Sequence, residues 1–347
     1  MPHRPRHRRT GSSATWLASL LTLTLALMFG TPTAAVAQPS PTQTPLRFGI
    51  LPFGGAVESR NDWRPLLADL SRAIGWPVSV LSVTSYESLD QAIRRNQVDI
   101  ALLTAKMALD AVTEGRMRVL AQVRRPDGAA DHRAVLLALD QGPDLAAVLA
   151  QPARWRLARG DSRSVSGFMV PQLQLFLPRG ISIETAFAAD IVGTHQDTAL
   201  AVANGNADVA TNNTTDLERF GRQFPIEAAR LKVIWQSTPT PQAQIVMRSD
   251  SPPALQQKLR DFLAAYGRGK DGRGDAEREV LRSLHAALGY EPADNTALLP
   301  AAALDYQLAW QRALHAKWVN DAAREARLKR IQAAYAAQVD MLRAPVR

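Results

Sequence analysis

The chain has 347 residues, with 41 Lys and Arg against 32 Asp and Glu, and it contains no cysteine. Without cysteine it has no disulfides, no thiolate metal site, no cysteine nucleophile and no lipid anchor on an N-terminal cysteine. Four of the nine net positive charges lie within the first ten residues, and the remaining +5 is spread along the chain, which suits an anionic ligand and argues against nucleic acid binding.

The N-terminal segment predicts a secretory signal peptide over residues 1–37. A basic start is followed by an apolar run from Trp16 to Phe29 and by small residues that end at Ala37. This order is typical of a signal cleaved after an A-x-A pattern, here before Gln38. A membrane anchor is the alternative, but the apolar run is shorter than the roughly 20 residues that a span needs. We therefore expect a periplasmic protein with a disordered, Pro-rich leader at residues 38–45.

Strand and helix patterns alternate from residue 46 onward. Residues 46–52 predict a buried strand, and residues 63–74 predict a helix with Asp62 as N-cap and Pro65 in the first turn. Further strands are expected at 76–83 and 98–103, with helices at 88–95 and 105–112. Such alternation indicates a mostly parallel α/β sheet.

The alternation restarts after the turn at 140–143. Strands are expected at 155–159, 187–192 and 207–211, with helices at 166–176 and 197–203. Two more strands, at 233–236 and 243–248, would lead the chain back to the first half. A mature length of about 310 residues fits two lobes. We assign 46–138 to the first part of lobe 1, 139–242 to lobe 2, 243–300 to the return to lobe 1, and 301–347 to C-terminal helices.

The last predicted helix carries an apolar stripe. Its members recur at helical spacing and are Leu328, Ile331, Tyr335, Val339 and Leu342. Such a stripe most often covers the core of its own molecule. A homodimer formed through this helix is the alternative interpretation.

The two halves share a spacing. Tyr86 opens a predicted helix and is followed thirteen positions later by Asp99, while His195 opens another and is followed thirteen positions later by Asp208. In each half the aspartate enters a strand that ends in polar residues, Thr104 in the first half and the run 211–214 in the second. The spacing suggests structural counterparts, with Tyr86 and His195 facing each other across a cleft.

The segment Gly160–Gly167 (GDSRSVSG) is the strongest candidate for a ligand contact. Its small residues leave backbone N–H groups accessible, Ser164 and Ser166 add hydroxyls, and a helix follows at once. A helix start holds anions such as phosphate through unpaired N–H groups and a partial positive charge. An ordinary serine N-cap without a ligand is the alternative. His195 and His132, taken singly, are equally compatible with structural roles.

Enzymatic signatures are sparse. The chain has no H-E-x-x-H, G-x-S-x-G or P-loop pattern, and its histidines are scattered. A trio of Ser164, Asp161 and His195 is not selected by any spacing. We therefore expect a protein that is not an enzyme and needs neither a cofactor nor a metal.

These segments together resemble a known family. LRFGILPFGG, QVDIALL, GDSRSVSGFMVP and GTHQDTALAVANGNADVATNNT are similar to the phosphate-, phosphite- and phosphonate-binding proteins of ABC importers. The resemblance runs from about residue 46 to about residue 304 and is most specific in the SxSG loop and the run from His195 to Asn213. It implies a type II periplasmic-binding-protein fold, in which two α/β lobes close around a small phosphorus oxyanion.

The resemblance also implies roles for individual residues. The family's Ser-Thr-Ser loop, which grips the phosphonate oxygens, corresponds to Ser164-Val165-Ser166, so the middle hydroxyl is absent here while the backbone N–H of Val165 remains. The family's cleft tyrosine and histidine match Tyr86 and His195. A second cleft tyrosine aligns with His132.

The amine end of the family's site departs from the pattern. Binders of aminoalkylphosphonates hold the ammonium group with two carboxylates, and here Thr215 and Ala243 stand at those positions. Asp216 lies one position beyond Thr215, and one helical position turns a side chain by about 100°. Thr215 and Asp216 are therefore candidates at this end, with Asp216 expected to point elsewhere. A buried ammonium without carboxylates is costly, so a phosphite, phosphate or methylphosphonate is favoured.

The sequence thus predicts a periplasmic solute-binding protein that captures a phosphonate, phosphite or phosphate-like oxyanion for an ABC permease. A ligand-sensing subunit that reports to a membrane receptor kinase is a second hypothesis with the same fold. A secreted phosphoesterase is a third, which would need metal ligands or a nucleophile–base pair.

Overall fold

A computed structural model of the chain describes residues 44–51, 56–124 and 132–344. The predicted signal peptide at 1–37 lies outside the described residues, as does most of the leader. Within these ranges no helix is both long and apolar enough to cross a membrane.

The first sheet has six strands in the order β11-β4-β10-β3-β1-β2 over the described residues. Strand β1 pairs in parallel with β2 and β3, whereas β10 lies antiparallel between β3 and β4 and β11 lies antiparallel to β4. The strands are β1 (Leu46–Ile50), β2 (Val78–Ser82), β3 (Ile100–Leu103), β4 (Met117–Val123), β10 (Gln244–Arg248) and β11 (Tyr290–Pro292). The associated helices are α1 (Ala56–Ile74), α2 (Tyr86–Arg94), α3 (Ala105–Thr113), α8 (Pro253–Ala265) and α9 (Gly272–Ser283).

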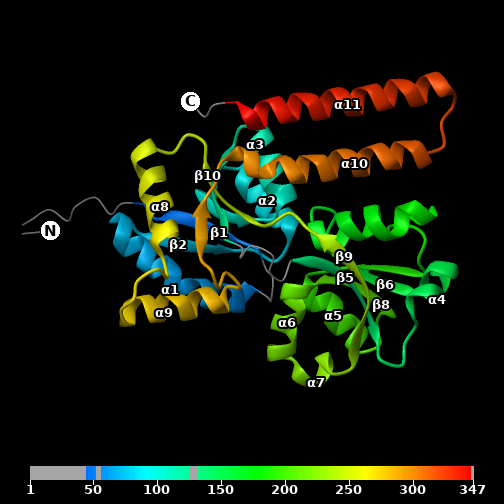
Figure 1. The fold of residues 1–347 in the computed structure, drawn as a ribbon, viewed down its shortest axis with the longest axis horizontal. Helices are drawn as coiled ribbons and strands as arrows, with labels where there is room; N and C mark the ends of the chain where they lie inside the picture. Colours follow the sequence, from blue (N-terminus) through cyan, green and yellow to red (C-terminus); the bar gives the residue numbers. More distant parts are fainter. Residues whose placement is uncertain (1–43, 52–55, 125–131, 345–347) are drawn as a thin grey trace, which may run out of the picture. The chain divides into compact units, whose positions relative to one another are not determined.

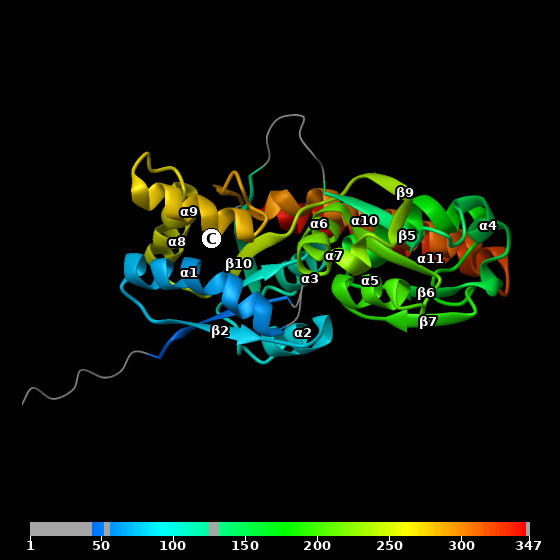
Figure 2. The same cartoon turned by 90° about the horizontal axis from the view of Figure 1, so that it is seen from below.

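The second sheet has five strands in the order β7-β6-β8-β5-β9 among the same described residues (Figures 1 and 2). Strand β6 is parallel to β7 and β8, and β5 is antiparallel to β8 and β9. The strands are β5 (Arg133–Leu139), β6 (Arg156–Arg159), β7 (Ala189–Val192), β8 (Val209–Asn213) and β9 (Leu231–Pro239). The helices are α4 (Leu145–Ala150), η1 (Pro152–Arg154), η2 (Val165–Met169), η3 (Pro171–Phe176), η4 (Leu177–Arg179), α5 (His195–Ala203), α6 (Thr214–Gln223) and α7 (Pro225–Ala228).

The chain passes between the two sheets twice, from β4 to β5 and from β9 to β10. In the part of the chain that the structure describes, strand β5 pairs with β8 and β9 of the second sheet, although our sequence division kept residues up to 138 in the first lobe. Strand β10 joins the first sheet, as expected for a returning segment. These two crossings and the two α/β sheets are the architecture of a two-lobed periplasmic binding protein.

Helix α1 begins earlier than the sequence indicated. The prediction of a start at Trp63 with Asp62 as N-cap is wrong, because the helix already begins at Ala56 and contains both Asp62 and Pro65. Its buried face, which includes Trp63 and Leu66, packs onto the first sheet and offsets the backbone hydrogen bond that a proline cannot donate. Asp62 instead forms an ion pair with Arg219.

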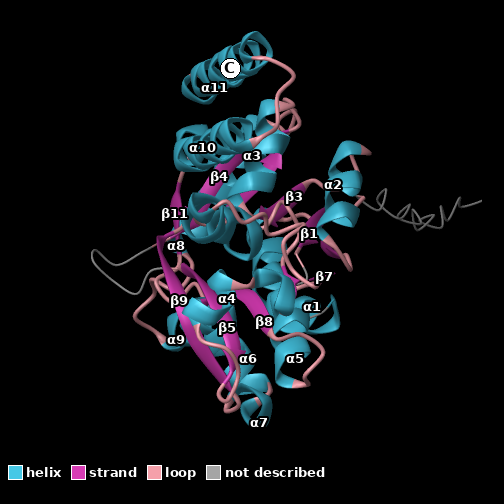
Figure 3. Cartoon of the chain, turned by 90° about the vertical axis from the view of Figure 1, so that its right-hand side faces the viewer, coloured by secondary structure: helices cyan, strands magenta, loops and turns pink. Residues whose placement is uncertain are grey.

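The C-terminal segment forms η5 (Asn295–Leu298) and the long helices α10 (Leu299–His315) and α11 (Asp321–Arg343), which run side by side (Figures 1 and 3). Ile331 and Leu342 of the predicted stripe are buried, and Tyr335 stacks on Tyr306 of α10 at a ring-centroid distance of 4.5 Å. The stripe therefore packs against its own molecule, as the first interpretation expected.

The thirteen-residue correspondence marks a real structural repeat. Asp99 accepts hydrogen bonds from the backbone N–H of Arg47 at 2.8 Å and from its Nε at 2.9 Å, just before β3 begins. Asp208 accepts the same pair of bonds from Arg156, at 2.7 and 3.1 Å, just before β8 begins. Each aspartate thus ties the strand that follows it, β3 or β8, to a neighbouring parallel strand, β1 or β6.

Candidate functional site

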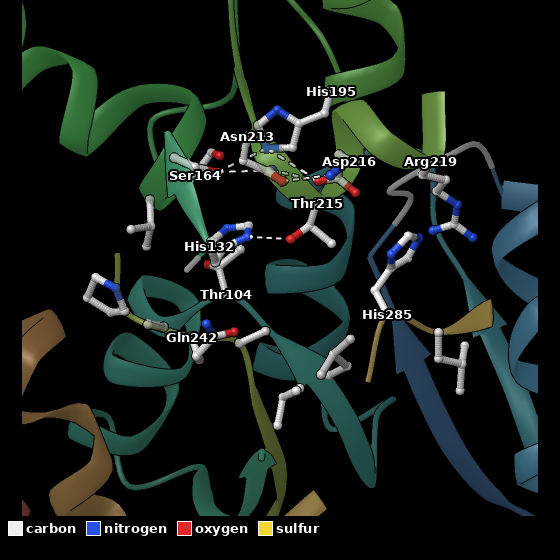
Figure 4. A pocket seen from close by; sticks show the side chains of 18 of the residues that line it. Thr104, His132, Ser164, His195, Asn213, Thr215, Asp216, Arg219, Gln242 and His285 are labelled. Atoms are coloured by element: carbon white, nitrogen blue, oxygen red, sulfur yellow. Dashed lines mark hydrogen bonds and ion pairs between the residues drawn. The ribbon is translucent and has the colours of Figure 1, made fainter. Parts of the chain in front are cut away.

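A cavity of about 120 Å³ is lined by residues from both sheets and their helices (Figure 4). The eight binding residues predicted from the sequence all line it: Tyr86, His132, Ser164, Val165, Ser166, His195, Thr215 and Asp216. The structure therefore brings together residues that lie up to 130 positions apart in the chain.

Five helices of the described part of the chain begin at this cavity. Tyr86, Ala105, Val165 and His195 are the first residues of α2, α3, η2 and α5, Thr215 is the second residue of α6, and all five line the cavity. Because the N–H groups of a helix's first turn lack intrahelical partners and carry a partial positive charge, each start attracts an anion. Their convergence makes the cavity suited to an oxyanion.

The Ser164 loop packs closely against its neighbours, so that Gly167 has no room for a side chain. The hydroxyl oxygen of Ser164 caps the helix by accepting the Gly167 N–H at 3.0 Å. A β-carbon on Gly167 would approach that oxygen to 2.8 Å and His195 Cε1 to 3.0 Å, which only glycine avoids. The helix then winds with wide i→i+5 bonds, such as Met169 N–H to the Ser164 carbonyl at 3.1 Å, a form often found at functional sites.

A chain of polar contacts joins the three helix starts of the second sheet. Asn213 caps α6, and its Nδ2 donates to Ser166 Oγ at 3.3 Å and to Asp216 Oδ2 at 2.7 Å. Ser166 Oγ lies 3.3 Å from His195 Nε2. Ser164, Ser166, His195 and Asn213 are all buried, so these groups are oriented before a ligand arrives.

Burial sets the protonation states of His195 and Tyr86, the two helix-start residues related by the repeat. Removal from water lowers the pKa of His195, an effect that the nearby Asp216 carboxylate opposes. Burial likewise raises the pKa of Tyr86. His195 is therefore neutral and Tyr86 keeps its hydroxyl proton near pH 7, so Tyr86 presents a donor to an anion.

The expectation that Asp216 points elsewhere is wrong. Asp216 is the third residue of α6 after the Asn213 cap, and a side chain at this position folds back toward the start of the helix. Its carboxylate thus lines the cavity, 3.9 Å from His195 Nε2. Beside it, Thr215 Oγ1 contacts His132 Nδ1 at 3.2 Å.

Sequence reasoning missed several lining residues. Thr104 and Asn213 lay in the polar strand ends noted above, and Gln242 lay beside Ala243 at the amine end of the family's site. Arg219 and His285 were not considered. Arg219 could have been found, because it follows Asp216 by one helical turn. His285 has no local signal, since a long-range return of the chain places it at the cavity. Within the described residues, no cluster of three or more His, Cys, Asp or Glu is arranged to hold a metal ion.

Comparison with known proteins identifies the family of the chain. The family model described as ABC transporter, phosphonate, periplasmic substrate-binding protein matches residues 48–298. The phosphonates-binding periplasmic protein of Escherichia coli K12 is 33% identical over 235 residues, which cover 67% of this chain and 69% of the relative.

Solved structures of similar proteins show the same fold. A binding protein component of an ABC phosphonate transporter from Pseudomonas aeruginosa superposes with a TM-score of 0.79 at 29% identity, covering 85% of this chain and 97% of the other. A Prochlorococcus marinus protein solved with methylphosphonate gives a TM-score of 0.65 at 18% identity, covering 76% and 97%. The chain belongs to the family of periplasmic substrate-binding proteins of phosphonate ABC transporters.

Proposed function

We propose that the cavity binds the phosphorus end of a phosphonate, phosphite or phosphate through the Ser164-Val165-Ser166 loop, with Tyr86 and His195 as further contacts. The convergence of five helix starts on one cavity is the observation that carries this proposal. The hydroxyls of Ser164 and Ser166 and the first-turn N–H groups of η2 would donate to the oxygens.

Asp216 adds a requirement on the form of the ligand. It is the sole carboxylate among the described lining residues, and it lies within the same polar cluster as Ser166 and His195. A carboxylate beside an oxyanion repels it unless a proton lies between them. The site therefore favours a phosphorus oxyanion that keeps one P–OH group and donates it to Asp216.

Calorimetric titration of the purified mature protein with methylphosphonate, phosphite, phosphate and 2-aminoethylphosphonate tests the proposal. We expect saturable binding of at least one of these with one site per chain. No heat with any of the four, for a protein that unfolds cooperatively, would overturn the assignment. Release of phosphate from a phosphoester by the same preparation would instead favour the phosphoesterase hypothesis.

We further propose that the protein delivers its ligand to an ABC permease after export through cleavage before Gln38. The family membership supports transport rather than sensing. Mass spectrometry of the protein from the periplasmic fraction should give Gln38 as the first residue. Loss of ligand uptake in cells that lack the protein distinguishes an importer subunit from a sensor, whose loss would change transcription and leave uptake intact.

A homodimer through α11 stays a prediction, which sedimentation would decide.

A further inference from the structure

The cavity continues past Asp216 to a wall that the anion grip does not use. Arg219 of α6 and His285, in the turn after α9, face each other there, on the far side of Asp216 from Ser164 and Asn213 (Figure 4). Leu284 and Tyr290 also line the cavity. The backbone of His285 has φ of 55°, a conformation that non-glycine residues seldom adopt.

The contact with Arg222 identifies the nitrogen of His285 that carries the proton. Arg222 Nη2 lies 3.0 Å from His285 Nε2. A guanidinium can only donate, so Nε2 accepts and the ring proton is on Nδ1. Burial lowers the pKa of His285 to about 4, with Arg219 and Arg222 adding to the effect, so the ring is neutral near pH 7. Among the described residues, His285 Nδ1 makes no hydrogen bond.

The charges around this wall are already balanced. Arg219 pairs with Asp62 of α1, and Asp216 lies one helical turn before Arg219. A carboxylate on the ligand would lie close to Asp216, and an ammonium would lie close to Arg219, because both residues line the cavity. An uncharged acceptor avoids both conflicts and uses the vacant N–H of His285.

We propose that His285 forms a subsite for an uncharged hydrogen-bond acceptor, such as a carbonyl oxygen, on the carbon substituent of a phosphonate. This inference rests on the proposed function, because it presumes that the phosphorus group occupies the Ser164 loop. It assigns His285 the role of choosing among phosphonates that differ in their substituents, while Arg222 positions the ring.

Two isosteric ligands test the subsite. 2-Oxopropylphosphonate carries a carbonyl where 2-methylprop-2-enylphosphonate carries a methylene group, so the ratio of their affinities isolates the acceptor. In the wild-type protein the ketone should bind about threefold to tenfold more tightly, as expected for one neutral hydrogen bond. His285→Ala should reduce that ratio to about one, and methylphosphonate affinity should change less. His315→Ala, which alters an exposed histidine of α10, should keep the wild-type ratio.

His285→Asn provides a second measurement, because asparagine tolerates the left-handed backbone and still offers an N–H donor. This variant should keep part of the preference for the ketone. A wild-type ratio near one, or a ratio unchanged by His285→Ala, would overturn the subsite while methylphosphonate binding still supports the proposed function. Absence of binding by all three phosphonates would overturn the proposed function itself.

Discussion

The Asp216 carboxylate lies 3.9 Å from His195 Nε2. His195 contacts the Ser166 hydroxyl, and Asp216 accepts a hydrogen bond from Asn213, which also donates to Ser166. Because His195 is neutral at pH 7, it does not cancel the charge of Asp216. A phosphorus oxyanion that enters this cluster therefore needs a proton to bridge it to the carboxylate. The affinity of the site for its ligand should thus depend on whether the ligand is protonated.

The affinity for methylphosphonate should fall as pH rises through the second ionisation of the ligand. Phosphoryl groups lose their second proton near neutral pH, at about 6 for a phosphoester, and the dianion has no proton to give Asp216. Asp216→Asn should flatten or reverse this dependence, because an amide can donate to the dianion. Among the described residues, the ionisable side chains that share the cavity with Asp216 are Tyr86, His132, His195, Arg219, His285 and Tyr290.

Calorimetry between pH 6.5 and 8.5 measures this effect, with Asp161→Asn in the Ser164 loop as the matched control. His195 and His285 stay neutral over that range because burial lowers the pKa of each. A wild-type affinity that rises with pH would contradict the bridging proton.

Ser166→Ala should weaken methylphosphonate binding by roughly tenfold or more, since a hydrogen bond to a charged group contributes about 1.5–3 kcal/mol. Ser164→Ala should in addition lower the free energy of unfolding by about 1 kcal/mol, because Ser164 caps the helix through Gly167. Ser162→Ala changes an exposed serine of the same loop and serves as control. Unaltered affinity in the double variant of Ser164 and Ser166 would remove this loop from the site.

Ligand binding should favour a closed arrangement of the lobes, because the ligand would join Tyr86 to His195. Two ion pairs connect helices of the first sheet with segments of the second, Glu87 with Arg163 and Asp62 with Arg219. Small-angle scattering should show a smaller radius of gyration at saturating methylphosphonate. The same radius with and without ligand would speak against closure.

The repeated Asp–Arg pairs should make equal contributions to stability. Burial alone would raise the pKa of Asp99, but its bonds from Arg47 outweigh burial and lower it, and the bonds from Arg156 lower the pKa of Asp208. A lowered aspartate pKa adds stability above the unfolded value of about 3.9, and that stability is lost as pH falls through the folded value.

Asp99→Asn and Asp208→Asn should each therefore cost about 1 kcal/mol of unfolding free energy at pH 7 and much less at pH 3. Urea unfolding at the two pH values measures both, with the exposed Asp275→Asn as control. A cost confined to one of the pair would show that the two positions are not energetic counterparts.

Local patterns predicted most of the fold, and together with the family resemblance they identified eight of the residues that line the cavity. Strand–helix alternation and the matched spacing of Asp99 and Asp208 identified the repeat. In each half, an aspartate at the start of a strand accepts a hydrogen bond from an arginine on the neighbouring parallel strand. The start of α1 was missed because Pro65 reads locally as a first-turn residue, whereas packing on the sheet decides the helix's extent. The direction of Asp216 depended on capping by Asn213, and the place of His285 depended on a long-range return that no local pattern encodes.

Methylphosphonate or phosphite should bind more tightly than 2-aminoethylphosphonate. Thr215 and Ala243 are uncharged at the positions where family members that bind an amine have carboxylates, and both line the cavity. Asp216 is present, but Asn213 already donates to it at 2.7 Å and a P–OH group would compete for its remaining lone pairs. An ammonium would then be desolvated with at most one shared carboxylate and with Arg219 nearby, which is unfavourable.

Titration of the three ligands in one buffer decides this order, and Thr215→Glu offers a complementary variant. A glutamate at this position would supply a second carboxylate, so it should raise the affinity for 2-aminoethylphosphonate relative to methylphosphonate. If the wild-type protein instead binds 2-aminoethylphosphonate tenfold more tightly, equivalent to about 1.4 kcal/mol, Asp216 would be an ammonium ligand. Asp216→Asn should then abolish that preference, whereas a proton-bridging Asp216 predicts that the variant leaves 2-aminoethylphosphonate the weaker ligand.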